Sequence, residues 1–526
     1  MKSFLRRIYS KVKADPSWSF FLAFAFLSAL SLPLARAAMV LSLFFTLASP
    51  ARRRSIRITS PTLGWLVYLA LAAGVTAAMW ALDPEPDFLE PARGFRKLGK
   101  LLWYAAIPLA VAQVDSRPRL VATLRALVWG GAFAAAGVIL LNPLLAWVQL
   151  SLPSDVDIAA GTATPAAEWV YRAAKAVGKL DDLRRWVLSC GQPQTFQGAL
   201  IKVGTMQTAQ RLMVAVPAAL CLLLEAFRGL GRGRRFGAAL MLLLCTAGLV
   251  LTYKRGPFLA CAAVSFAILL SRLSVWRAIL VAALLAAAFG GVAAAVPPVR
   301  ARFAQLPEEF AVRKGGRTAM WKVIVPELHR EHPWGVGFRA LTWKKIHYGM
   351  PELDKARDRR IRQVNRRIEL NQNHMHSVPM QAFVEFGYAG LLAWLFWTML
   401  GFRATSRLAR LSRRPAPGSS LPETVCFAAP LAMFAALFLY GLVEYNLADS
   451  EVVLLYALSM GLTGPSLLHA APDPSAAADA AAADADAPAP RRRTWAWLLA
   501  YVVLGAALCG GYALLCRSYV RILALP

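Results

Sequence analysis

Long apolar runs separated by short polar segments recur along almost the whole chain. They approach the roughly 20 residues that a helix needs to cross the hydrocarbon core of a bilayer, and no stretch alternates apolar and polar residues as a barrel strand does. The pattern therefore predicts an all-α polytopic membrane protein, a bundle of about 12 or 13 transmembrane helices. The expected spans are residues 18–35, 37–49, 62–82, 101–114, 120–150, 207–227, 236–253, 257–270, 275–296, 378–401, 425–447, 452–468 and 495–515.

Most of the short connections between these spans on one side of the bundle are basic. The segments "ARRRSIR", "DSRPR" and "FRGLGRGRR" fall on the same side as the basic N-terminal segment, and the positive-inside rule places that side in the cytosol. No small-residue cleavage site is clearly placed at the first span, so we expect an uncleaved anchor. The long segments 151–206 and 297–377 then lie outside.

The spans and long segments together predict the domain organisation. We expect a transmembrane bundle over residues 1–296 (spans one to nine, with external loop 151–206), a large helical external loop over 297–377, spans ten to twelve over 378–469, a disordered Ala/Asp/Pro linker over 470–494, and a last transmembrane helix within 495–526.

Composition agrees with a membrane protein and excludes other classes. Hydrophobic residues make up 58% of the chain, charged residues only 17%, and the net charge is +30. Because much of this charge lies in the short cytosolic connections, it follows from topology and gives no reason to expect nucleic-acid binding. The seven cysteines lie mostly inside predicted spans, so no disulfide framework is readable.

The external loop 297–377 departs from the charge rule that the short connections obey. It carries 17 Lys and Arg against 8 Asp and Glu, and five of the six histidines. Arginine binds phosphate oxygens in a bidentate manner, so such a loop suits an anionic lipid head group, above all a diphosphate-linked one. The alternative is a solvated basic face that touches anionic membrane lipids.

Three motifs follow one another in and around this loop. They are "LTYKRGPFLA", then Arg317 with Trp321 and "HPWGVGF", then His376 and Ser377 followed by Gln381, Glu385, Gly387 and Gly390. In order and spacing the set resembles the O-antigen ligase and polymerase superfamily, over roughly residues 207–396. Two positions depart from its pattern, since Ser377 stands where Asn is common and Lys254 where Ser is common.

The resemblance implies an inverting, metal-independent glycosyltransferase of the bacterial inner membrane, with loop 297–377 periplasmic and catalytic. Its partners would be an undecaprenyl-diphosphate-linked O-antigen donor, a lipid A–core acceptor and membrane lipids, with no cofactor and no nucleic acid. Close alternatives are an O-antigen polymerase and a ligase that transfers the glycan to protein. A transporter of lipid-linked glycans is less favoured, because its helices would carry more charges along a path.

The resemblance also assigns roles to single residues. His376 is expected to be the general base, since imidazole titrates near neutral pH, and Arg255 and Arg317 are expected to bind the diphosphate. His374, Arg339 and Arg211 are expected to bind substrate.

Each assignment has a plainer alternative. His376 would otherwise cap the next helix, and Arg255 would otherwise anchor its helix at the interface. A metal held by His374 and His376 is not expected, because no third ligand is evident nearby. Gly387 and Gly390 are interpreted as positions of close packing.

Overall fold

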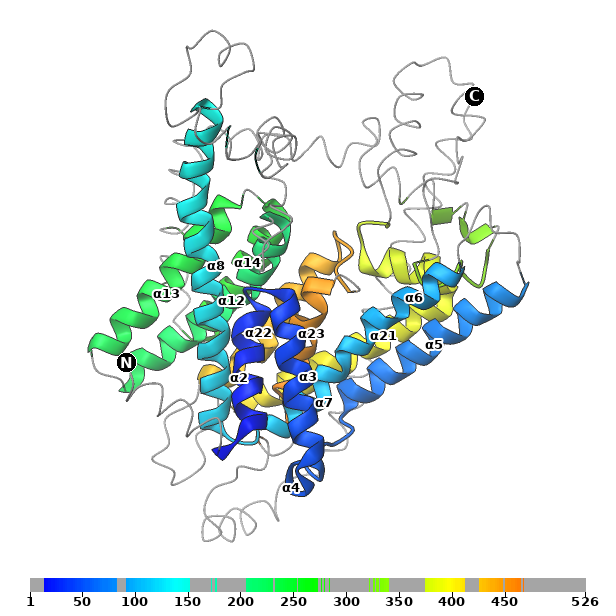
Figure 1. Ribbon diagram of the computed structural model, residues 1–526, viewed down its shortest axis with the longest axis horizontal. Helices are drawn as coiled ribbons and strands as arrows, with labels where there is room; N and C mark the ends of the chain where they lie inside the picture. Colours follow the sequence, from blue (N-terminus) through cyan, green and yellow to red (C-terminus); the bar gives the residue numbers. More distant parts are fainter. Residues whose placement is uncertain are drawn as a thin grey trace.

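The computed structural model describes residues 14–82, 91–151, 205–229, 232–252, 254–272, 332–339, 374–411, 425–447 and 450–464, with residues 172, 176, 276, 279, 283, 321, 325–326, 328–330 and 467 besides (Figure 1). The secondary structure in these residues is helical throughout and includes no strand, as the hydropathy pattern predicts. Predicted span 495–515, the linker 470–494 and almost all of span 275–296 lie outside the described residues.

The helices overlap the predicted spans, but α2 ends seven residues before the expected end of the first span and α21 runs ten residues beyond the expected end of the tenth. They are α2 (Pro16–Ser28), α3 (Leu32–Ala48), α4 (Pro50–Arg53), α5 (Ser60–Leu82), α6 (Pro91–Leu102), η1 (Trp103–Ala105), α7 (Ala106–Gln113), α8 (Arg117–Ser151), α12 (Thr205–Gly229), α13 (Arg232–Leu251), α14 (Arg255–Arg272), α21 (Val378–Leu411), η3 (Val425–Ala428), α22 (Ala429–Gly441) and α23 (Ser450–Gly461).

By length and apolar composition, four of these helices can cross a membrane, within α5, α8, α12 and α21, and six shorter apolar helices accompany them. The predicted span 101–114 differs from the rest. It comprises the end of the amphipathic α6, a 3-10 turn and the eight-residue α7, and the charges of "ARGFRKLGK" directly precede it. The chain is therefore a multi-pass membrane protein.

Helix α12 runs between the two ends of the bundle, where it contacts different partners. At its start, Met206 Sδ accepts a hydrogen bond from Tyr440 Oη in α22 (3.1 Å). Near its end, Glu225 binds Arg117 at the start of α8 (2.7 Å) and the backbone N–H of Cys426 (3.1 Å). The end of α22 and the start of α8 thus lie at opposite ends of the bundle.

A group of ion pairs, here called the charge latch, joins three helices at the second of these ends. Asp15 caps α2 by accepting from Trp18 N–H, and it also binds Arg52 after α3 (2.7 Å) and Arg119 in α8 (2.9 Å). Asp115 lies 3.4 Å from both arginines. One capping carboxylate therefore joins α2 to α4, which directly follows α3, and to α8 at this end.

At the other end, α21 is broken by a kink at Phe386 and Gly387, whose φ angles are −139° and +61°. The kink leaves the carbonyls of Val384 and Glu385 free to accept hydrogen bonds from Val336 N–H (3.0 Å) and Gly337 N–H (2.9 Å). The segment 332–339 is thus bound to the interrupted helical turn, much as a strand pairs with a neighbour. Figure 1 shows α21 running beside α5 from this region.

Two glycines allow this close approach. Gly335 has φ +92°, and a Cβ there would lie 2.4 Å from Glu385 O. Gly387 has φ +61°, and a Cβ there would lie 2.5 Å from Pro333 O. Both backbones are left-handed and both lack space for a side chain, so glycine is required on two counts. The kink and the "HPWGVG" motif form one device, called here the glycine clamp.

Candidate functional site

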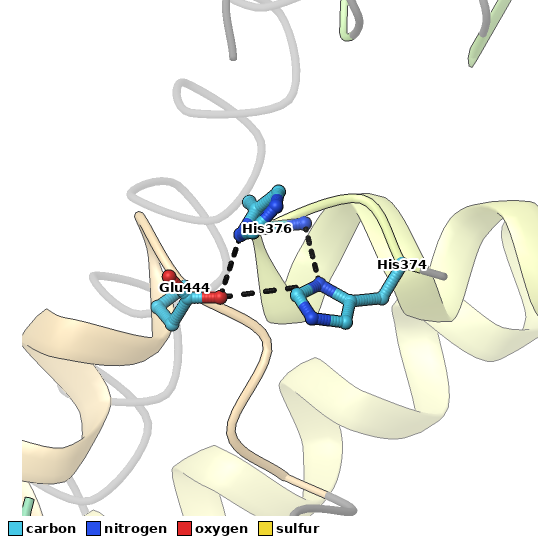
Figure 2. Close-up of side chains that lie close together, drawn as sticks. All are labelled: His374, His376 and Glu444. Atoms are coloured by element: carbon cyan, nitrogen blue, oxygen red, sulfur yellow. Dashed lines mark hydrogen bonds and ion pairs between the residues drawn. The ribbon is translucent and has the colours of Figure 1, made fainter. Parts of the chain in front are cut away.

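Two histidines and a glutamate meet at the clamp end of the bundle (Figure 2). His374 and His376 lie on the segment that leads into α21, while Glu444 lies in the turn that follows α22. The Nδ1 atom of His376 is 2.7 Å from Glu444 Oε1, and Nδ1 of His374 is 3.9 Å from the same oxygen. Glu444 is 5% exposed, whereas the side chains of the histidines are 28% and 22% exposed. A buried carboxylate therefore underlies two accessible imidazoles.

The hydrogen bonds fix which ring nitrogens carry protons. His374 Nδ1 accepts from the backbone N–H of His376 (3.3 Å), so this nitrogen must be unprotonated. An ionised carboxylate can only accept hydrogen bonds, so with Glu444 ionised Nδ1 of His376 carries a proton and donates it to Oε1 in a hydrogen bond. The Nε2 atom of a neutral His376 then holds a lone pair, which is the arrangement that a general base requires.

The backbone of this cluster is strained. Within the part of the chain that the structure describes, His376 (φ +48°) and Arg339 (φ +47°) are the non-glycine residues with positive φ. A left-handed backbone disfavours residues with a Cβ and persists only where the surroundings enforce it. Both residues belong to the predicted site, which is where strained backbone conformations concentrate in proteins.

A ladder of buried polar side chains connects the histidines to the glycine clamp. Gln381 Oε1 accepts from Met375 N–H (2.7 Å), and Gln381 Nε2 donates to Glu385 Oε1 (2.7 Å). The same Glu385 oxygen accepts from Arg339 N–H (2.8 Å). Gln381 and Glu385 lie four residues apart on one face of α21 and are fully buried. The four-residue spacing of Gln381 and Glu385 thus has a structural reason in this molecule: it holds two loop segments together.

Aromatic contacts complete the surroundings of the histidines. The ring of Tyr445 lies 5.7 Å from that of His374, and the guanidinium of Arg339 lies 5.1 Å from the centre of the same tyrosine ring. The indole N–H of Trp321 donates to the carbonyl of Met375, between the two histidines. Arg339 therefore lies close to the cluster, and its role in substrate binding stays a prediction.

Arg255 is the first residue of α14, and its neighbour Gly256 fixes its place. A Cβ at Gly256 would lie 2.7 Å from the ring of Tyr440, so the start of α14 packs on the end of α22. Tyr440 precedes Glu444 by four residues. Helix N-termini favour anions through their free N–H groups and dipole. Arg255 and this N-terminus thus supply positive potential beside the cluster.

The two remaining predicted residues are Arg211 and Arg317. Arg211 is 1% exposed, and its Nη1 donates to Leu30 O (2.9 Å) in the turn between α2 and α3, a contact that supports a structural role; its predicted substrate binding stays a prediction. Arg317 lies outside the described residues. His329, a histidine of the external loop that was not assigned to the site, packs against the rings of Phe383 and Tyr388. Partial burial lowers its pKa.

The expectation that the His-x-His pair lacks a third ligand is wrong. His374, His376 and Glu444 offer ligand atoms within 4.8 Å of one another, a set that can hold a metal ion. The separation of 2.7 Å between His376 Nδ1 and Glu444 Oε1, however, is that of a direct hydrogen bond. Two ligands of one tetrahedral zinc, each at about 2.0–2.1 Å, lie roughly 3.3 Å apart. The geometry described fits a hydrogen-bonded pair better than a ligand set.

Sequence reasoning did not assign Glu444 to the site, because it is 68 residues from His376 along the chain. Its signal was available: "LVEYN" places an acidic residue at the end of an apolar run. An ionisable residue in such a position is rare without a function or a partner.

The fold and this site define a multi-pass helical membrane protein with a titratable, basic site at one end of its bundle. Residues 238–395 match the model of a protein family described as O-antigen ligase, which confirms the resemblance to that superfamily inferred from the motifs. The matched segment includes Arg255, Arg339 and both histidines of the cluster but ends before Glu444. A comparison with curated proteins found no match.

Proposed function

We propose that this protein is an O-antigen ligase, an inverting glycosyltransferase that transfers O-antigen polysaccharide from undecaprenyl diphosphate to the lipid A–core oligosaccharide. The observation that carries the proposal is the pairing of His376 with Glu444 on a strained backbone. The family match to residues 238–395 supports the reaction class. The proposed location is the bacterial inner membrane, with the site on its periplasmic face and membrane lipids around the bundle.

In the proposed reaction, a hydroxyl group of the acceptor attacks the anomeric carbon of the sugar that is bonded to the diphosphate. Nε2 of His376 takes the hydroxyl proton as the new C–O bond forms. The bond between the anomeric carbon and the diphosphate oxygen breaks, and its electron pair leaves on the diphosphate. Attack opposite the leaving group inverts the anomeric configuration. Glu444 orients the imidazole through Nδ1–H and stabilises the imidazolium that forms, as carboxylates do in other His-carboxylate pairs.

Positive charge stabilises the leaving diphosphate in this proposal. Arg255, at the N-terminus of α14, is assigned to it. Arg317 is assigned with it from its place in the same motif as Trp321, whose indole N–H donates to the carbonyl of Met375. His374, Arg339 and Arg211 are assigned to binding the sugars and phosphates of the two substrates.

The mechanism proposed requires neither a metal ion nor a nucleotide. Purified protein with a lipid-diphosphate-linked glycan and a lipid A–core acceptor is therefore expected to transfer the glycan in EDTA and without ATP, because cleavage of the diphosphate linkage provides the driving force. Loss of transfer in EDTA, with recovery on addition of a divalent ion, would make His374, His376 and Glu444 metal ligands and overturn the base mechanism.

The acceptor needs a separate experiment, since polymerases and protein-directed ligases of the superfamily share these motifs. Deletion of the gene, followed by gel analysis of lipopolysaccharide, distinguishes them. A ligase leaves an intact core band without the O-antigen ladder, while polymerised lipid-linked glycan remains. Loss of the polymer itself would indicate a polymerase, and an unchanged ladder would exclude both roles in lipopolysaccharide.

A further inference from the structure

Gln210, in the second turn of α12, is a buried amide whose hydrogen-bonding groups are not satisfied by the protein. Its side chain is 1% exposed, and neither Nε2 nor Oε1 has a hydrogen-bond partner. Gln207 Oε1, one turn earlier on the helix, is likewise buried without one. An unsatisfied buried amide costs about 1–3 kcal/mol, so a sequence keeps one only where something else compensates.

The other buried amides of the described residues differ from Gln210. Gln113 Nε2 donates to Thr46 (2.7 Å), Gln381 makes two hydrogen bonds, and Asn446 is bonded through both amide atoms. Gln113 Oε1 has no partner, but each of these three amides is held by at least one hydrogen bond within the protein. Of the four fully buried amides among the described residues, Gln210 is the one with neither amide atom bonded, which points to a ligand as its partner.

The position of Gln210 on α12 directs it toward the candidate site. Met206 contacts Tyr440 in α22, and Gln210 follows Met206 by four residues, which places it about 40° further around the helix and about 6 Å along it. Tyr440 in turn packs on Gly256, next to Arg255. Gln210 therefore lies on nearly the same face of α12 as Met206, one turn further along from the contact with α22, at the end of the bundle that holds the His376–Glu444 pair.

The hydrogen-bonding groups of an amide limit the kinds of ligand group that could bind Gln210. A phosphate oxygen only accepts hydrogen bonds and would satisfy Nε2 alone, whereas a sugar hydroxyl or acetamido group both donates and accepts. Because both atoms of Gln210 are unsatisfied, we propose that Gln210 binds the sugar bonded directly to the donor diphosphate, through a hydroxyl or acetamido group. This assignment rests on the proposed function. It adds a contact between the protein and the donor sugar whose anomeric carbon reacts.

The test compares two probes with wild-type protein and Gln210→Leu in nanodiscs. The probes are undecaprenyl diphosphate and undecaprenyl diphosphate carrying one N-acetylhexosamine. We expect the variant to bind the bare diphosphate as the wild type does, and to bind the sugar-bearing probe about tenfold more weakly. Its thermal stability should equal or exceed that of the wild type, because an unsatisfied amide has been removed.

A matched control is Gln113→Leu, which removes an amide bonded to Thr46 at the opposite end of the bundle. It should lower thermal stability and leave the binding of both probes unchanged. Gln210→Met, closer in shape to glutamine, replaces Gln210→Leu if that variant does not fold, and the same results are expected.

The outcomes separate this inference from the proposed function. If wild type and variant bind both probes equally, or if the variant loses both equally, Gln210 does not contact the sugar and the inference is wrong while the proposed function stands. If the wild type itself binds neither probe, the proposed function fails, and the inference fails with it.

Discussion

The two ends of the bundle each pair a carboxylate with basic side chains at 2.7 Å, yet they differ in what the pairing does. In the charge latch, Asp15 binds two arginines that are always charged, and it caps a helix of regular geometry. At the clamp end, Glu444 meets His376, whose charge depends on one proton, on a left-handed backbone. The ion pairs of the charge latch, between permanently charged side chains on regular backbone, hold helices together. The His376–Glu444 pair, with an imidazole on a strained backbone, is suited to proton transfer.

The largest expected effect is the loss of transfer activity when His376, at the clamp end, is replaced. His376→Ala should lower single-turnover transfer by about 100-fold or more, the usual scale for loss of a general base, with donor binding nearly unchanged. His374→Ala is the matched control and should affect binding more than the transfer step. Near wild-type transfer by His376→Ala, with loss in His374→Ala, would move the base to the other imidazole.

The glycine clamp should respond to a single methyl group. Gly335→Ala must adopt φ +92° with its Cβ 2.4 Å from a backbone carbonyl, so we expect a loss of about 1–3 kcal/mol of stability together with reduced transfer. Gly237→Ala is the control, because a Cβ there has nothing within 4 Å. Thermal unfolding of both variants in the same detergent measures the difference. Equal melting temperatures would show that the clamp tolerates side chains.

Glu444→Gln tests whether the carboxylate acts through His376. The amide preserves size and can still accept from Nδ1–H, but it cannot stabilise an imidazolium by charge. Transfer should fall about tenfold while donor affinity stays the same, a smaller loss than that of His376→Ala. Adding Glu444→Gln to His376→Ala should cause little further loss if the two residues act as a unit. Independent, multiplicative losses would assign Glu444 another role.

The charge latch should give the smallest effect, and only on stability. Partial burial raises the pKa of Asp15, but hydrogen bonds from Ser17 and Trp18 N–H and the charges of Arg52 and Arg119 outweigh it and hold the pKa below its ordinary value. The contribution is therefore present above pH about 4 and is lost as pH falls through the lower, folded-state pKa.

Asp15→Asn should accordingly lower the free energy of unfolding by about 1 kcal/mol or less near neutral pH, with transfer unchanged. Melting temperatures of wild type and variant, measured from pH 7 to pH 3, should converge at the acidic end. A difference that grows with acidity would contradict the assignment.

The sequence was sufficient for the elements that depend on local hydropathy. Helices α5 and α12 begin and end within two residues of the expected spans, because apolar runs of membrane length leave few alternatives. Span 101–114 was wrong as a single crossing helix, since the charges of α6 lie just before it. Hydropathy detects an apolar run but not the 3-10 turn that divides it.

The sequence indicated several residues of the cluster but not its geometry, and the roles of these residues stay predictions. His374, His376 and Arg339 follow from motif positions, and the structure brings them together. The pairing with Glu444, the positive φ angles and the kink at Gly387 arise from tertiary contacts between segments far apart in the chain, which no local pattern encodes. Gly387 was interpreted as a site of close packing. It does pack closely, against Pro333 O, but the backbone conformation at the kink also requires it.

The polar ladder has a consequence for how such chains can diversify. Arg339 N–H and Met375 N–H, which border the stretch 340–373, are both anchored to Gln381 and Glu385 within one turn of α21. The two ends of that stretch are therefore closed by the bundle itself. Since the entropy of closing a loop changes by only about 0.6 kcal/mol for each doubling of its length, insertions, deletions or exchange of this stretch leave the positions of His374, His376 and Arg339 unaltered. Gln381 and Glu385 thus hold the segments on both sides of that stretch independently of its length.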